Sequence, residues 1–212
     1  MRVSDYDYGR DLRGINLALR LLRHEARLST VCAWTGFNEE RVRVLSRSRR
    51  RHQVNRVAGT HRGPSPRRVK PLFASLALRS EGAAMAGLCR VLGVIPAKPI
   101  SNARQRLPGV ANGERLCDAF ELFREVVPSA RLTLEQAISL VYAVSEGQLC
   151  SLDHCTRCRA LILVDHLSLT RRVCTHCQNE ERRTGAEVPL QVEEPPPMSD
   201  CESLCFQLSL FD

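Results

Sequence analysis

Residues 155–177 read CTRCRALILVDHLSLTRRVCTHC and contain two pairs of cysteines, Cys155/Cys158 and Cys174/Cys177. Only two residues separate the cysteines of each pair, so one tight turn can direct both sulfurs at the same ion. The C-x2-C-x15-C-x2-C spacing is typical of four thiolates around one structural Zn²⁺. The β-prone segment Leu161–Val164 lies between the pairs and predicts a strand in a short hairpin that brings the two turns together. We therefore predict a zinc ribbon over residues 148–183, with metal-dependent folding.

Other chemistry fits these cysteines less well. A redox C-x-x-C needs only one pair, on a βαβ frame that the sequence lacks, and iron–sulfur motifs usually place three thiols close together. A catalytic zinc keeps one position open, which four thiolates would fill. Four neighbours are alternative ligands, although a supporting or surface role suits them better: Cys150, His154, His166 and His176. Three further cysteines fall on apolar helix faces and are predicted to be small buried hydrophobes: Cys32, Cys89 and Cys117.

The sequence before residue 148 predicts helices. The first has a face that steps by three and four residues, made of Leu12, Ile15, Leu19, Leu22 and Ala26. Further helices are expected over 29–34, from Asn38, over 72–92, over 116–127, and from a capping box at Thr133–Gln136 to Gly147. We predict a mainly α protein: a helical DNA-binding region with a basic loop (1–112), a helical pair (113–147), the zinc ribbon, and an acidic, proline-rich, disordered tail (184–212).

Residues 28–47, LSTVCAWTGFNEERVRVLSR, resemble a helix-turn-helix. The small residue Cys32 is followed four positions later by Gly36, and Val31, Phe37, Val42 and Leu45 occupy the expected buried positions. An ordinary pair of helices joined by a glycine turn would show the same features. The second helix would present its polar side outward, with its first residues on base edges and its later arginines on phosphates.

Positive charge is concentrated next to this segment. The chain has a net charge of +8, yet residues 41–80 contain twelve basic residues and no acidic one. Such a block is suited to a polyanion such as DNA, although a solvated loop without a partner would also explain it. The predicted DNA contacts are Asn38, Arg43, Arg47, Arg49, Arg50, Arg51, Arg67 and Arg68.

Several function classes are excluded by what the sequence lacks. It has no phosphate-binding G-x-x-x-x-G-K-[ST], no G-x-G-x-x-G and no G-x-S-x-G, and Leu28 stands where a metalloprotease helix after His24-Glu25 needs its second histidine. An enzyme is therefore not expected. No apolar run approaches the ~20 residues of a membrane helix, and the first 30 residues have no continuous apolar core of a signal peptide. We expect a cytoplasmic protein that makes no contact with a membrane.

The helical first part, basic middle and four-cysteine end together resemble the flagellar transcriptional activator FlhC family. The likeness is closest in ERLCDAFELF (114–123) and SLVYAVSEGQL (139–149), which run into the two cysteine pairs, and it extends less specifically to residues 27–47. It covers roughly residues 10–180. The resemblance implies an activator that binds promoter DNA with a helical FlhD-like subunit, contacts RNA polymerase and carries zinc on Cys155, Cys158, Cys174 and Cys177.

The C-terminal segment Gln207–Phe211, QLSLF, suggests a different role. It resembles the pentapeptide by which bacterial replication and repair proteins bind the sliding clamp, with Leu210 and Phe211 in an apolar pocket and Gln207 and Leu208 beside it. The same residues could instead fold back on their own chain. The alternatives to an activator are thus a clamp-tethered repair or replication factor and a module that binds an acidic protein partner or its own acidic tail.

Overall fold

The computed structural model describes residues 5–52, 69–168 and 171–184. The chain divides into two compact units, 1–179 and 180–212. The first contains seven α-helices and a two-stranded hairpin within its described residues, and α8 runs across the boundary into the second. The mainly helical class predicted from the sequence is confirmed.

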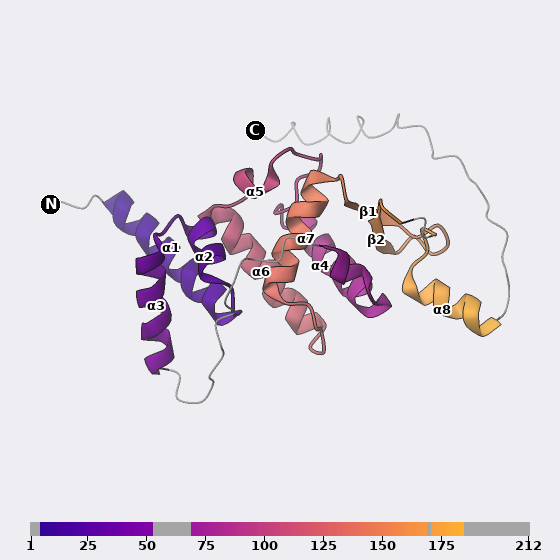
Figure 1. Ribbon diagram of the computed structural model, residues 1–212, viewed down its shortest axis with the longest axis horizontal. Coiled ribbons are helices and arrows are strands. Elements are labelled where there is room, and N and C mark those ends of the chain that lie inside the picture. Colours follow the sequence, from indigo (N-terminus) through magenta and orange to yellow (C-terminus); the bar gives the residue numbers. More distant parts are fainter. Residues whose placement is uncertain (1–4, 53–68, 169–170, 185–212) are drawn as a thin grey trace, which may run out of the picture. The chain divides into compact units, whose positions relative to one another are not determined.

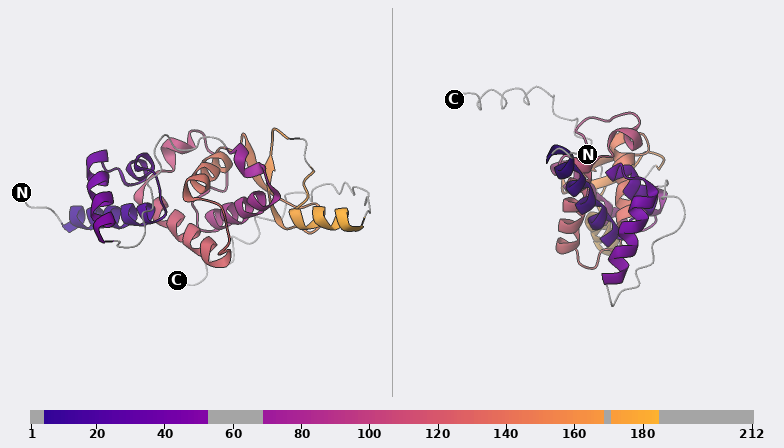
Figure 2. Two further views of the ribbon diagram at one scale, coloured as in Figure 1. Left: turned by 60° about the horizontal axis from the view of Figure 1, so that its bottom comes forward. Right: turned by 90° about the vertical axis from the view of Figure 1, so that its left-hand side faces the viewer.

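Three helices form one group: α1 (Asp5–Arg23), α2 (Leu28–Thr35) and α3 (Glu39–His52) pack against one another (Figures 1 and 2). Gly36 ends α2 in the left-handed conformation, with φ 74°, and donates its N–H to the Cys32 carbonyl. Asn38 Oδ1 accepts a hydrogen bond from the Arg41 N–H at 2.9 Å and so caps α3. The predicted ends of these two helices are confirmed.

The predicted face of α1 is only partly correct. The deeply buried residues are Leu17, Ala18, Leu21 and Leu22, whereas Leu12 is 47% exposed and Ala26 lies beyond the end of the helix. The apolar side of this helix is broad, so the row beginning at Leu12 marks its edge rather than its centre.

The helix α7 (Leu134–Glu146) is deeply buried: every residue from Leu134 to Ser145 except Gln136 is buried. It packs against α4 (Leu76–Val91), which is preceded by a short 3₁₀ helix at Lys70–Phe73, and against α5 (Ala103–Arg106). The helix α6 (Val110–Val126) packs against α4 and α1. The capping box at Thr133 and Gln136 is present, and Gly147 ends α7 with φ 68°, so both predicted ends of this helix are confirmed.

α1 packs closely on α6. A Cβ atom added to Gly113 of α6 would lie 2.6 Å from Leu17 Cδ2, so the glycine is what permits this approach. Along the exposed edge of the contact, Arg20 Nη2 lies 2.7 Å from both Asp118 Oδ1 and Glu121 Oε2, and His24 Nε2 lies 3.0 Å from Glu121 Oε1. One hydrophobic core therefore joins the first helices to the later ones, with residues from Leu17 to Leu163.

The hairpin follows α7. Strand β1 (Cys150–His154) pairs antiparallel with β2 (Leu161–Asp165), with Leu152 opposite Leu163. It packs on α4 and α7, and the side chain of Leu163 lies against Gly82 of α4. The predicted strand at 161–164 is confirmed. The second cysteine pair, however, lies at the start of α8 (Thr175–Thr184) and not in a second turn between strands.

No helix among the described residues is both long enough and apolar enough to cross a membrane.

Candidate metal centre and basic helix

The four predicted metal ligands come together. The sulfur atoms of Cys155, Cys158, Cys174 and Cys177 all lie within 4.8 Å of one another, and Cys158 Sγ is 3.5 Å from Cys174 Sγ. A tetrahedral ion with metal–sulfur bonds of 2.3 Å requires sulfurs about 3.8 Å apart. The cluster therefore has the size of a four-thiolate metal site and could hold a metal ion.

Two backbone segments hold this geometry. The first pair lies in the turn between β1 and β2, where the Cys155 N–H donates to the Ala160 carbonyl at 2.8 Å. The second segment is joined to it through Thr156, whose N–H and hydroxyl both donate to the Arg172 carbonyl, at 3.0 and 3.2 Å. Ile162 and Val173 pack with the buried cysteines in a small core that is separate from the helical one.

Backbone N–H groups also point at the sulfurs. Cys174 N lies 3.3 Å from Cys155 Sγ, and Cys177 N lies 3.4 Å from Cys174 Sγ. Burial raises the pKa of the Cys155 thiol, but hydrogen bonds from the N–H groups of Cys158, Cys174 and Arg157 outweigh it and lower the pKa to about 6. Burial and the neighbouring thiols raise the pKa of Cys177. A thiolate is thus favoured at Cys155, and a bound cation would favour ionisation of Cys177.

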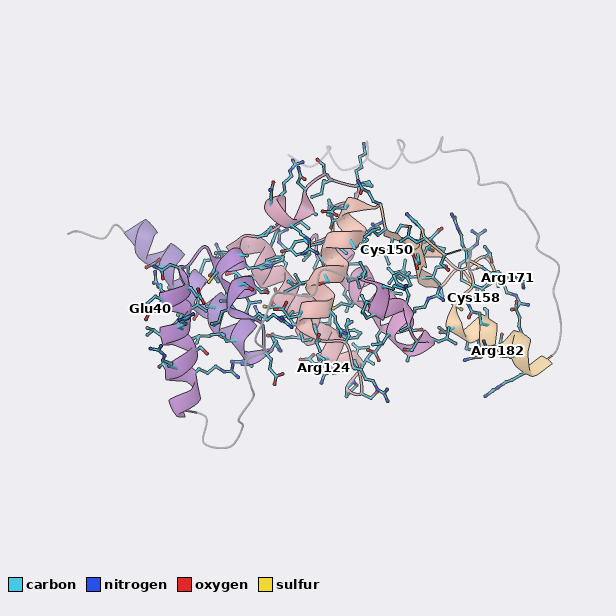
Figure 3. All side chains as sticks on the ribbon, in the orientation of Figure 1. Glu40, Arg124, Cys150, Cys158, Arg171 and Arg182 are labelled. Carbon is cyan, nitrogen blue, oxygen red and sulfur yellow. The ribbon has the colours of Figure 1, made fainter. Side chains whose placement is uncertain are left out.

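Of the four alternative ligands, only His176 has a possible ligand atom close to the cluster in the described part of the chain. Cys150 is buried in the helical core at the far end of β1 from Cys155 (Figure 3). His166 Nε2 lies 2.8 Å from Ser151 Oγ, and its Nδ1 lies 3.2 Å from the Gln148 carbonyl oxygen, so both ring nitrogens are used within the hairpin. His154 and His176 are exposed, and a ring nitrogen of His176 lies within 4.8 Å of Cys177 Sγ.

The three cysteines predicted to be buried hydrophobes lie in the helical part. Cys89 and Cys117 are fully buried, and burial raises the pKa of each thiol to about 12. Cys32 is half-buried, with its pKa raised by burial and by the Glu39 carboxylate. The prediction is confirmed for Cys89 and Cys117, and only in part for Cys32.

The helix α3 separates its buried and exposed sides clearly. Val42 is fully buried and Ser46 nearly so, whereas Arg43, Val44 and Arg47 are exposed. Arg43 Nη2 lies 2.7 Å from Glu39 Oε1 one turn earlier, an exposed pair of low energy. Arg47 has no ion pair or side-chain hydrogen bond within the described part of the chain. α3 therefore presents cationic groups on its outer side.

The other predicted DNA contacts have varied positions. Asn38 is exposed and uses its Oδ1 as the helix cap. Arg49 donates through Nη1 to the Leu22 carbonyl, which directs its guanidinium toward α1. Arg50 and Arg51 continue α3, but their side chains lie outside the described residues. Other predicted sites also lie outside the described residues: Arg67, Arg68, the tail beyond residue 184, and the clamp-like residues Gln207, Leu208, Leu210 and Phe211.

Comparison with known proteins identifies no relative: no protein-family model matches the chain, and no curated protein matches it.

Proposed function

We propose that this protein is a DNA-binding transcriptional activator and that its four-cysteine site holds one structural Zn²⁺. The observation that carries the proposal is the division of α3 into a buried side, with Val42 and Ser46, and an exposed side, with Arg43 and Arg47. This helix follows a short helix and a left-handed glycine turn, which is the order of elements in a helix-turn-helix.

In this proposal α3 lies in the major groove. Asn38 and the first turn of α3 would then face base edges, while the arginines of the later turns neutralise phosphates. Arg47 supports this role because its guanidinium is exposed and has no protein partner in the described residues. The Arg43–Glu39 pair opposes DNA binding only weakly, since exposed ion pairs contribute about 1 kcal/mol or less.

The proposed zinc is structural because all four donors are cysteines. Four thiolates complete a tetrahedron and leave no position for water or substrate. The ion would tie the hairpin turn to the beginning of α8 and take the place of the large core that this small module lacks. Thiolate sulfur also favours Zn²⁺ over Mg²⁺ or Ca²⁺, which prefer oxygen.

The resemblance to the FlhC family adds the expected partners, namely a FlhD-like subunit and RNA polymerase at promoters of flagellar or related operons. Exposed apolar side chains on α6 are compatible with a protein partner: Leu122 is 41% exposed, and Val126, one turn later, is 71% exposed.

Binding of the full-length protein to duplex DNA, measured by fluorescence anisotropy at several salt concentrations, tests the proposal. If about six phosphates are neutralised, the logarithm of the affinity falls with the logarithm of the salt concentration with a slope near −5. A flat salt response would contradict DNA binding.

Genome-wide crosslinking of the tagged protein then distinguishes an activator from a replication or repair factor. Discrete promoter peaks support an activator. A diffuse signal, with the sliding clamp among the proteins that copurify, supports a replication or repair factor.

A further inference from the structure

The exposed side of α3 carries a stripe of three chemically different side chains: the carboxylate of Glu40, the apolar side chain of Val44 and the guanidinium of Arg47. All three are exposed. They follow one another at intervals of four and three residues, which places them on one line along a helix. Val42 and Ser46, two positions before and after Val44, are buried. Because two positions correspond to just over half a turn, the stripe lies opposite the packed side of α3.

The other polar side chains at the beginning of α3 already have partners in the protein. Asn38 Oδ1 accepts the Arg41 N–H as the helix cap. The Arg41 guanidinium is held toward α1, with Nη2 3.0 Å from Asp11 Oδ2. Arg43 Nη2 lies 2.7 Å from Glu39 Oε1. These groups are therefore less available to a ligand than the stripe is.

Glu40 places a negative charge on the side of the helix that we propose faces DNA. Its carboxylate has no ion pair or side-chain hydrogen bond within the described residues (Figure 3 labels this residue). Phosphates repel a carboxylate, so Glu40 weakens binding to any DNA in which no base offers it a donor. In the major groove, cytosine offers such a donor, because its amino group is the usual partner of acidic side chains. The position of Glu40 therefore favours a cytosine.

Val44 offers an apolar surface on the same stripe, with 53% of the residue exposed. The major groove presents one apolar group, the 5-methyl group of thymine. Residues four positions apart in a helix are separated by about 6 Å along its axis, and successive bases of one strand by about 3.4 Å. Val44 would thus meet a base about two positions from the one that Glu40 contacts.

We propose that α3 reads DNA sequence through Glu40 and Val44. Glu40 accepts a hydrogen bond from the amino group of a cytosine, and Val44 packs against the methyl group of a thymine about two base pairs away. Arg47, further along the same stripe, binds a phosphate and holds the helix in the groove. This inference rests on the proposed DNA binding and adds a base preference to it.

Selection from a pool of random duplexes with the full-length protein identifies the preferred sequence. Each thymine of the selected duplex is then replaced in turn by deoxyuridine, which removes only the 5-methyl group. At one thymine we expect the affinity, measured by fluorescence anisotropy, to fall about fourfold, the contribution of one buried methyl group. Val44→Ala should bind the thymine and uracil duplexes about equally. Val126→Ala, at an exposed valine on α6, should keep the wild-type difference.

Glu40→Ala tests the second contact by effects of opposite sign. It should weaken binding to the selected duplex about tenfold, because the cytosine amino group loses its acceptor. It should also strengthen binding to random-sequence duplex, because a carboxylate that repels phosphates is gone. Glu125→Ala, at an exposed carboxylate on α6, should leave the ratio of the two affinities unchanged. Equal weakening for both duplexes would show that Glu40 only stabilises the first turn of α3, and would contradict the base contact.

Failure of this readout is distinguishable from failure of DNA binding itself. The readout is wrong, and DNA binding stands, if the protein binds duplex DNA with a steep salt slope but selects no sequence. The same holds if no thymine depends on its methyl group, or if Val44→Ala retains that dependence. Binding that does not vary with salt would contradict both proposals.

Discussion

The sulfur atoms of Cys158 and Cys174 lie 3.5 Å apart, although sixteen positions separate the two residues in the sequence. This separation is close to the edge of a tetrahedron around a zinc ion. A metal ion would therefore find its ligands in place and require only small movements of the side chains.

Removal of the metal should destabilise the protein. We expect the purified protein to contain one equivalent of zinc, and Cys174→Ser to lower both the zinc content and the melting temperature, because three thiolates hold the ion less tightly. Mass spectrometry of the metal content and thermal unfolding with and without a chelator measure these effects. Cys32→Ser, outside the cluster, is the control and should keep its zinc. Full zinc content and unchanged melting in Cys174→Ser would contradict the assignment.

Removal of one cation from α3 should weaken DNA binding. Arg47→Ala is expected to lower the affinity about fivefold at 0.15 M salt and to make the salt slope about 0.9 less negative, the effect of one lost phosphate contact. Arg106→Ala removes another exposed positive charge, on α5, and should change neither value strongly. Equal effects of both substitutions would mean that net charge, and not the face of α3, determines binding.

The ion pairs between α1 and α6 should make stability depend on pH. The hydrogen bond from Arg20 and the neighbouring His24 hold the pKa of Glu121 below its usual value near 4.5. Since the folded state lowers this pKa, the stabilisation is fully present above about pH 4.5 and is lost as the pH falls through the folded pKa. Glu121→Gln should therefore lower the free energy of unfolding by about 1 kcal/mol at pH 7 and by less at pH 3.

Urea unfolding at the two pH values measures this difference. Glu125→Gln provides a matched control, because Glu125 is exposed on the same helix. A loss at Glu121 that is equally large at both pH values would show that its packing, and not its charge, stabilises the contact.

Loss of the capping box should destabilise the central helix. Thr133→Ala removes the hydroxyl that accepts the Gln136 N–H, and we expect it to lower the free energy of unfolding by about 1 kcal/mol. Thr133→Ser retains a hydroxyl and should lie near the wild type in the same urea titration. A serine variant as unstable as the alanine variant would refute the capping explanation.

Glycine should be favoured at position 159. Arg159 has φ 61°, a conformation that costs most residues about 1 kcal/mol or more, so Arg159→Gly should raise stability by up to about 1 kcal/mol. Arg157→Gly, two positions earlier, should lower it by about 0.5–1 kcal/mol, because glycine there adds freedom to the unfolded chain and removes the side chain whose Nη1 lies 3.5 Å from the Cys177 carbonyl oxygen. Thermal unfolding of the metal-loaded protein compares the two; a less stable Arg159→Gly would contradict the strain argument.

Features that depend on neighbouring residues were predictable from the sequence. The left-handed turns at Gly36 and Gly147, the cap at Asn38 and the Thr133–Gln136 capping box each require only a few adjacent residues. The cysteine spacing likewise predicted the cluster, because the ligands occur in local pairs.

Features that depend on tertiary packing were not predictable from the sequence. The centre of the α1 face is set by the contact of Leu17 with Gly113, which the periodicity of α1 alone does not contain. Strand β1 carries Cys150, Asp153 and His154 and shows little of the β-prone character of β2, so its pairing with β2 determines it.

The spacing of the cysteines also bears on the order in which the protein folds. All four ligands lie within residues 155–177, whereas the contact between Arg20 and Glu121 closes a loop of 101 residues. By the logarithmic dependence of loop closure on length, joining Arg20 to Glu121 costs about 1.6 kcal/mol more chain entropy than joining Cys158 to Cys174. The metal module can therefore form as an early, local unit, while the helical core waits for the long-range contact between α1 and α6.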